Sequence, residues 1–295
     1  MRQLLVDVWK GDWGLASVDL DCLQVLAYLK FNAVDFHINN ANNPFFTPEG
    51  KFPVLRTKGQ ALTKFEDIVA YMEEKNISSD YGLTKKQAAE TQAYSVLLRE
   101  KLFPALQFLW WVDANNEKGL TTPWYSKVLP YPFNFYYPGK YKRNAEIMIA
   151  SLYENIDDEK DIKDKVIGEA EKCLTTLSVR LGTNDFMFGS HPTQIDAMLY
   201  AYLAPLLKAP LCSTSLQNHL KACTNLNKFV SRISQRYFSQ EHHEYEKKIK
   251  NEMKNKNDQI EDDPDIIRNQ ILAIFFSIVT MVAYALHTGL IKRAT

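Results

Sequence analysis

The first 75 residues alternate short apolar and polar blocks in a pattern typical of strands and helices in turn. Val34, Phe36 and Ile38 stand at every second position, which is the period of a strand. Lys58-Gly59 separates two apolar runs and predicts a hairpin turn. The predicted order is β-α-β-β-β-α, in which the first three elements form a crossover unit and the hairpin adds antiparallel strands. The predicted strands are 4–9, 34–38, 53–57 and 60–63, and the predicted helices are 21–31 and 65–72.

Helical spacing dominates residues 83–240. Thr84 and Gln87 form a predicted capping box, and the helix that they open is expected to run to Trp111 with a bend at Pro104. A second helix is predicted where apolar residues recur at helical spacing and end at a glycine suited to a C-terminal cap. These residues are Ile167, Ala170, Leu174, Leu177, Leu181 and Gly182.

A segment rich in proline and aromatic residues, 122–139, interrupts this helical pattern. Pro130, Pro132 and Pro138 lie close together, and proline lacks the N–H that a helix interior requires, so we expect no regular helix there. The aromatic side chains either contact a partner or pack as a loop over the helical domain. The candidate contact residues are Tyr131, Phe133, Phe135, Tyr136 and Tyr137.

The longest apolar segment lies near the C-terminal end. Ile271 to Ile291 contains 21 residues without Asp, Glu, Lys or Arg, and as a helix it would span about 30 Å, the thickness of a hydrocarbon core. Arg268 precedes it, and Lys292 and Arg293 follow it. We expect a single transmembrane tail anchor; the alternative is a buried helix of a globular domain. Residues 241–268 are densely charged and predict a solvated helix that frays into a linker.

Composition narrows the classes of function. The chain has 295 residues, of which 46% are hydrophobic and 24% charged, as is ordinary for a globular protein. Its 35 basic and 35 acidic residues cancel, so no basic field attracts nucleic acid, and we expect no nucleic-acid partner. The mean hydropathy of −0.29 suggests a soluble protein, but this average hides the apolar C-terminal segment.

The cysteines and the N-terminal residues give no sign of secretion or metal binding. Four scattered cysteines without a CxxC motif fit reduced thiols rather than a disulfide framework or a metal site. His242 and His243 are adjacent on a charged helix and would point in different directions, so we expect no metal ligands there. Asp7 interrupts the first apolar run, so we expect neither a secretory signal nor a matrix presequence.

Three local motifs resemble those of glutathione transferases. Phe52-Pro53-Val54-Leu55 resembles the family's strand entry, where the proline is cis, and residues 68–72 resemble the helix after the sheet. Thr193-Gln194-Ile195-Asp196 resembles its buried capping box, in which the aspartate reaches back to a backbone N–H. Pro53, Thr193 and Asp196 are therefore expected to determine the fold. The resemblance implies an α/β thioredoxin-like N-terminal domain and an all-α C-terminal domain, followed here by the single transmembrane helix.

The residues for thiol chemistry depart from that pattern. A thiol transferase needs a hydroxyl or thiol near the first strand–helix junction, and this position falls near Asp19, whose carboxylate would repel a thiolate. Ser17 and Cys22 remain weak candidates for the activating group. At the second helix, Phe65 cannot donate the hydroxyl that would hold glutathione, and Glu66-Asp67 is a doubtful substitute. We therefore assign no catalytic residue and no cofactor.

The fuller resemblance is to the metaxins, which have this fold and are attached to the mitochondrial outer membrane. Cys22 to Lys30 resembles the family's first helix, and Tyr131 to Gly139 resembles its interdomain loop. Phe186 to Gly189, together with Pro192 to Ala197, resembles its late helix. The C-terminal span points to the anchored metaxin-1 branch.

This resemblance implies a non-enzymatic accessory subunit of the sorting and assembly machinery, which inserts β-barrel proteins. Its partners would be the barrel-forming subunit, a metaxin-2-like protein, the lipid of the outer membrane and, for some members, motor-adaptor proteins. Residues 1–265 would face the cytosol and the C-terminus the intermembrane space. The alternatives are a membrane-tethered glutathione-dependent transferase or peroxidase, an adaptor for mitochondrial transport, and a scaffold on the endoplasmic reticulum. The expected domain limits are 1–78, 79–240, 241–268 (linker), 269–291 (anchor) and 292–295.

Overall fold

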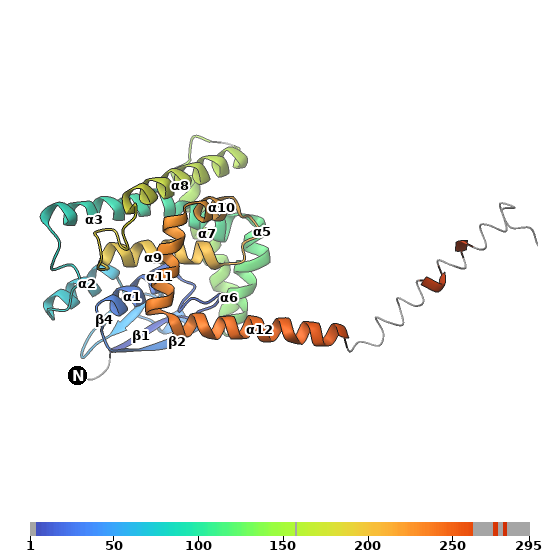
Figure 1. Ribbon diagram of the computed structural model, residues 1–295, viewed down its shortest axis with the longest axis horizontal. Coiled ribbons are helices and arrows are strands. Elements are labelled where there is room, and N and C mark those ends of the chain that lie inside the picture. Colours follow the sequence, from blue (N-terminus) through green and yellow to red (C-terminus); the bar gives the residue numbers. More distant parts are fainter. Residues whose placement is uncertain (1–3, 157, 262–273, 277–279, 282–295) are drawn as a thin grey trace, which may run out of the picture. The chain divides into compact units, whose positions relative to one another are not determined.

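The structure, a computed structural model, describes residues 4–156, 158–261, 274–276 and 280–281 (Figure 1). The chain divides into two compact units, Met1–His243 and Glu244–Thr295. The first unit contains a four-stranded sheet and most of the helices, and it carries every site described below.

The sheet has the strand order β2-β1-β3-β4. β1 and β2 are parallel, with Val6 beside Ile38, whereas β3 is antiparallel to both β1 and β4. The predicted β-α-β-β-β-α order is confirmed, because helix α1 connects β1 to β2 and helix α2 follows β4. The bounds are β1 Leu4–Trp9, α1 Leu20–Phe31, β2 Phe36–Ala41, β3 Val54–Arg56, β4 Ala61–Leu62 and α2 Phe65–Glu74.

The second strand begins later than its alternating pattern predicts, because Val34 belongs to the end of α1. Ala33 has a left-handed φ of 51°, and the Val34 N–H donates to the Leu29 carbonyl at 3.1 Å. Such a reversed C-terminal turn satisfies the last carbonyls of a helix. Alternation alone did not distinguish this turn from a strand.

Helix α1 is buried on all sides, since every residue from Cys22 to Leu29 is buried. It packs against α9 (Gln194–Lys208) of the helical part. Because α1 is apolar all round, the sheet and the helices share one hydrophobic core.

The helical part agrees with the predicted caps. Thr84 and Gln87 form the capping box of α3, and the stripe from Ile167 to Leu181 is buried along α8, which ends at Gly182 with φ 56°. The helical run from α3 continues to Val112, and a π-helical turn precedes Pro104.

The bounds of the remaining helices are α3 Lys85–Leu97, α4 Phe103–Gln107, α5 Ala114–Asn116, α6 Thr122–Val128, α7 Phe133–Leu152, α8 Glu159–Leu181, α10 Ser215–Ala222, α11 Thr224–Tyr237 and α12 Ser239–Glu261.

The expectation that the prolines prevent a helix at 130–139 is wrong. Helix α7 begins at Phe133 and contains Pro138. Pro138 has no N–H to offer the carbonyl four residues earlier, on Asn134, but the Ser126 hydroxyl of α6 donates to that carbonyl at 3.4 Å. A partner from another helix thus satisfies the group that the proline leaves unpaired. The prolines at 130 and 132 precede the helix, and the Tyr131–Pro132 bond is cis.

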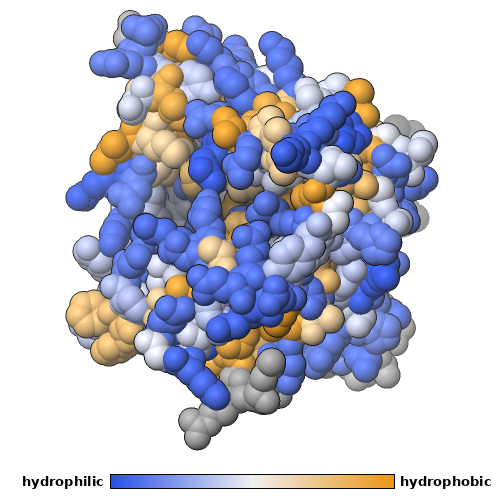
Figure 2. All heavy atoms as spheres, turned by 90° about the vertical axis from the view of Figure 1, so that its left-hand side faces the viewer, coloured by the Kyte–Doolittle hydropathy of each residue, from blue (hydrophilic) through white to orange (hydrophobic). Residues whose placement is uncertain are grey.

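The predicted membrane anchor, Ile271 to Ile291, lies outside the described residues except for 274–276 and 280–281, which are helical. Its flanks Arg268, Lys292 and Arg293 also lie outside them. No helix in the described part of the chain is both long and apolar enough to cross a membrane. On the face drawn in Figure 2, hydrophilic residues predominate and apolar residues lie in separate groups among them.

Candidate functional site

The junction between β1 and α1 holds the two weak candidates for thiol chemistry, Ser17 and Cys22. Both residues are completely buried. Asp19 lies between them and caps α1, because its Oδ1 accepts from the Cys22 backbone N–H at 3.0 Å. Its own N–H donates to the Ser17 hydroxyl oxygen at 3.3 Å. The structure brings the three residues together, and their polar atoms serve to start the helix.

The electrostatics of this junction oppose a thiolate. Burial raises the pKa of the Cys22 thiol well above its usual value, and the adjacent Asp19 carboxylate raises it further. Burial also raises the pKa of Asp19. The Tyr125 hydroxyl has its pKa raised by burial and then by the charge of Asp19. A thiol transferase must stabilise negative charge on sulfur, and the main effects at this junction do the opposite.

The start of α2 lacks the polar groups that would hold glutathione. Lys64 precedes the helix without a side-chain cap, and the Phe65 ring packs edge-to-face against a ring of α1 at 5.5 Å. Glu66, the possible substitute, is ion-paired with Arg99 at 3.1 Å. A cleft of about 210 Å³ remains beside Pro53, which follows a cis peptide bond as predicted.

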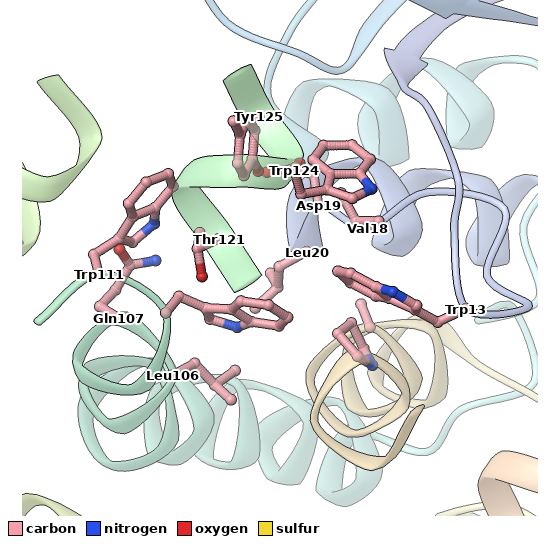
Figure 3. Close-up of a pocket in the computed structure, with 13 residues that line it drawn as sticks. Trp13, Val18, Asp19, Leu20, Leu106, Gln107, Trp111, Thr121, Trp124 and Tyr125 are labelled. Carbon is pink, nitrogen blue, oxygen red and sulfur yellow. The ribbon is translucent and has the colours of Figure 1, made fainter. Parts of the chain in front are cut away.

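A second cavity lies between the β1–α1 loop and the helical part and is lined by four tryptophans, Trp13, Trp110, Trp111 and Trp124 (Figure 3). Trp13 stacks on Trp110 with their centroids 5.9 Å apart. The Trp124 indole N–H donates to Asp12 Oδ2 at 3.0 Å. The volume is about 70 Å³, whereas sites for drug-sized ligands are roughly 300–1,000 Å³. This cavity admits a few atoms at most, so the tryptophans serve mainly to join the two parts.

Close backbone packing fixes the loop that carries Trp13. A Cβ atom on Gly11 would lie only 2.1 Å from the Leu15 carbonyl oxygen, so only glycine fits there. Trp13 has a left-handed φ of 53°. Lys208 of α9 donates to the Gly14 carbonyl at 3.0 Å, and burial lowers the pKa of this lysine to about 8.

Thr193 and Asp196 form the buried capping box of α9, as predicted. Asp196 Oδ2 accepts from the Thr193 N–H at 2.9 Å and from its hydroxyl at 2.8 Å. Asp196 Oδ1 accepts from the Met187 N–H at 2.8 Å. The carboxylate thus ties the loop before α9 to the helix, which is a structural role.

The predicted contact residues surround the first turns of α7, and they differ in exposure. Tyr131, Phe135 and Tyr136 are 81%, 76% and 59% exposed. Phe133 is half-buried, and Tyr137 is buried, so its side chain is not available on the surface.

Sequence reasoning missed two further exposed aromatic residues, Phe45 and Phe46, which are 61% and 77% exposed. They belong to a short 3₁₀ turn, η1 (Pro44–Phe46), after β2, and Phe45 stacks on Phe133 at 5.2 Å. Two adjacent phenylalanines inside a turn rich in Asn, Thr and Pro were the available signal, because loops lie at the surface. We call Phe45, Phe46, Tyr131, Phe133, Phe135 and Tyr136 the aromatic face.

Metal and disulfide chemistry find no support in the described residues. No cluster of three or more His, Cys, Asp or Glu side chains there could hold a metal ion. The four cysteines are free, with Cys22 and Cys173 buried and Cys212 exposed.

The arrangement defines a glutathione-transferase-like fold whose thiol junction is altered. A glutathione transferase from Phanerochaete chrysosporium matches with a TM-score of 0.51 and 13% identity, over 79% of this chain and 97% of that chain. A β-etherase from Sphingobium sp. strain SYK-6 matches with a TM-score of 0.51 and 15% identity, over 83% and 99%. At such low identities these matches show the fold alone.

Sequence comparison shows the family. Residues 22–142 match the family model described as an outer mitochondrial membrane transport complex protein, and residues 170–233 match a glutathione S-transferase C-terminal domain. Metaxin-1 of Macaca fascicularis is 36% identical over 97% of this chain and 91% of its own length. Human metaxin-1 is 36% identical over 97% of this chain but only 62% of its own length, and metaxin-3 of Danio rerio is 38% identical over 78% and 74%. The chain belongs to the metaxin family, which confirms the resemblance drawn from its motifs.

Proposed function

We propose that this chain is a non-enzymatic accessory subunit of the mitochondrial outer-membrane sorting and assembly machinery, which inserts β-barrel proteins. The observation that carries the proposal is the match of residues 22–142 to a family described as part of an outer mitochondrial membrane transport complex. In this role the chain caps the cytosolic side of the barrel-forming subunit and pairs with a metaxin-2-like partner. Residues 269–291 anchor it in the outer membrane, the charged linker 241–268 precedes that anchor, and residues 1–265 face the cytosol.

The β1–α1 junction supports a role without catalysis. The Cys22 thiol is buried, its pKa is raised, and Asp19 and Ser17 are engaged in starting α1. The exposed part of the aromatic face provides contact surface instead. Aromatic side chains that protrude from a stable fold commonly supply the main binding energy of protein interfaces.

Purification of the tagged full chain from outer membranes in mild detergent tests the proposal. The expected result is that the barrel-forming subunit and a metaxin-2-like protein co-purify with it. Tyr131→Ala and Phe135→Ala should reduce their recovery, whereas Val179→Ala, on an exposed apolar residue of α8, should not. Recovery of neither partner with the wild-type chain would reject the proposed function.

One observation favours a second candidate function, that of a membrane-tethered glutathione-dependent transferase or peroxidase. The cis bond at Pro53 and the adjacent cleft of about 210 Å³ are features that such an enzyme would use. Retention of the chain on immobilised glutathione, abolished by Ser17→Ala or Cys22→Ala, would favour this candidate. We expect no retention, since both side chains are buried.

The location has its own test. A fluorescent reporter fused to residues 266–295 should label the mitochondrial outer membrane. Reticular labelling would instead place the protein on the endoplasmic reticulum and reject the proposed location.

A further inference from the structure

The aromatic face brings residues from both halves of the fold to the start of α7, where Phe45, Phe46 and Phe133 form one contact group and Tyr131 and Phe135 form another. Phe46 meets Phe45 edge-to-face at 5.4 Å, and Phe45 stacks on Phe133 of α7. The turn is held by its own polar groups, because Asn43 Oδ1 accepts from the Phe45 N–H at 3.0 Å and the Thr47 hydroxyl donates to the Pro44 carbonyl at 2.7 Å. A surface that is ordered before binding loses little conformational entropy when a partner arrives.

The exposed area of this surface is large enough for a stable protein interface. An aromatic side chain offers about 150–250 Å², so the five most exposed members, at 59–81% exposure, present roughly 700 Å² in all. A standard protein interface covers about 800 Å² on each partner. The largest apolar patch of an ordinary monomer is about 300–600 Å².

Along α6 and the first turns of α7, the charge beside this surface has one sign, whereas Glu49 follows Phe46 on the η1 side. Residues 118–145 contain no Asp or Glu. Lys140 lies over the Tyr136 ring at 5.9 Å, and Arg143 follows one turn later on α7. Lys127, on the neighbouring helix α6, is also exposed. Within the described part of the chain these three residues form no ion pair, since the Glu117 carboxylate pairs with Lys142 instead. Their charge is available to a partner.

We propose that the aromatic face and its basic border, Lys127, Lys140 and Arg143, bind an acidic segment of another protein subunit. The aromatic rings pack against apolar side chains of that segment, and the three cations form ion pairs with its carboxylates. The inference rests on the proposed function, because the partner is a subunit of the same assembly, and it adds the chemistry of the partner and the role of Phe45 and Phe46. Phe, Tyr and Arg, which make up the exposed rings and part of their border, are enriched in protein interfaces. The belts that meet lipid are enriched in both Trp and Tyr; here the four tryptophans Trp13, Trp110, Trp111 and Trp124 line the interior cavity, and three of the five most exposed rings of the aromatic face are Phe.

Carbodiimide crosslinking of the purified complex tests the partner's chemistry directly, since this reagent joins an amine to a carboxylate in contact with it. We expect crosslinks from Lys140 or Lys127 to Asp or Glu of the co-purified subunit. Lys140→Arg should lose its crosslink but retain binding, because the charge is kept. Crosslinks from these lysines only to residues of the same chain would overturn the inference.

Two double variants of the full chain test the energetics. Phe45→Ala/Phe46→Ala and Lys140→Glu/Arg143→Glu should each lower recovery of the partner at least fivefold. The matched controls are Val179→Ala, which is 77% exposed like Phe46, and Lys228→Glu on α11. Raising the salt concentration should weaken the wild-type complex more than the charge-reversed one. A thermal unfolding midpoint close to that of the wild type shows that each variant is folded.

The outcomes separate this inference from the proposed function. If the wild-type chain recovers its partners and both double variants recover as much, the inference fails and the function stands. If the wild-type chain recovers none, the function itself fails. Vesicles of phosphatidylcholine with 20% phosphatidylserine and no protein serve as the lipid probe. If the double variants lose binding only to these vesicles, lipid is the occupant and the inference is overturned.

Discussion

Ionisation of the Asp196 carboxylate is expected to weaken the fold as the pH rises. The side chain is completely buried, and burial raises its pKa to about 6 from the ordinary 3.8, although hydrogen bonds from Thr193 and Met187 favour the charged form. A higher pKa in the folded chain means that this chain holds more protons than the unfolded one between these two values. The stability that this group contributes is therefore complete below about pH 4 and is lost as the pH rises through about 6.

The shift of about two units corresponds to about 3 kcal/mol of unfolding free energy, against a total of about 5–15 kcal/mol for a typical domain. Other carboxyl groups titrate as well, so the informative quantity is the difference between the wild type and Asp196→Asn, a neutral side chain of the same shape. We expect the advantage of the wild type to fall by about 2–2.5 kcal/mol between about pH 4 and about pH 7.5, because part of the loss has already occurred at pH 4. Urea unfolding of the full chain, followed by circular dichroism at each pH in one detergent, measures it.

Asp113→Asn is the matched control. Burial alone would raise the pKa of Asp113, but hydrogen bonds from Lys163 and Ser213 hold it below the ordinary 3.8. Its stabilisation is present above that value and is lost only as the pH falls further, so Asp113→Asn should differ from the wild type by a constant amount above about pH 4.5. If the advantage over Asp196→Asn stays constant or grows with pH, the reasoning about this buried carboxylate is refuted.

Three further predictions concern the β1–α1 junction and its surroundings. Gly11→Ala should lower the unfolding free energy by about 2 kcal/mol or more, because its Cβ would overlap a backbone carbonyl; a thermal melt measures the loss. Iodoacetamide at about pH 8 should modify the exposed Cys212 but not Cys22 in the folded chain, because the pKa of the Cys22 thiol is raised by burial; peptide mass spectrometry locates the label. Trp124→Phe should cost about 1–2 kcal/mol, because it removes the hydrogen bond to Asp12.

Each of these three predictions would be contradicted by one specific result. A Gly11→Ala chain as stable as the wild type would show that the loop relaxes freely. Labelling of Cys22 at the rate of Cys212 would show a reactive thiol. A Trp124→Phe chain of unchanged stability would mean that water replaces the lost hydrogen bond without cost.

The elements that the sequence predicts well are those fixed by local chemistry. The strand at 4–9 is predicted from its apolar run alone. The capping boxes at Thr84 and Thr193 depend only on a side chain three residues later in the sequence. The helix end at Gly182 depends only on a residue that can adopt a positive φ. The position of Asp19 between Ser17 and Cys22 was also readable, because all three lie within six residues.

The errors arise where a distant residue decides the outcome. Pro138 sits inside α7 because Ser126, on another helix, bonds to the freed carbonyl of Asn134. Phe45 and Phe46 join the aromatic face only because the fold brings their turn to Phe133, far along the chain. No local pattern contains these contacts, so they could not be read from the order of residues alone.

The tryptophan cavity gives the protein an intrinsic fluorescence signal that reports on the contact between the β1–α1 loop and the helical part. Four of the five tryptophans of the chain line one small space, and their rings come from the β1–α1 loop on one side and the helical part on the other. Tryptophan emission therefore comes mainly from this cavity. Any movement that separates the β1–α1 loop from the helical part and admits water should shift the emission maximum to longer wavelength. Binding events at remote surfaces can thus be followed in the unlabelled chain, and an unchanged spectrum would indicate that the chain joins its partners as a rigid body.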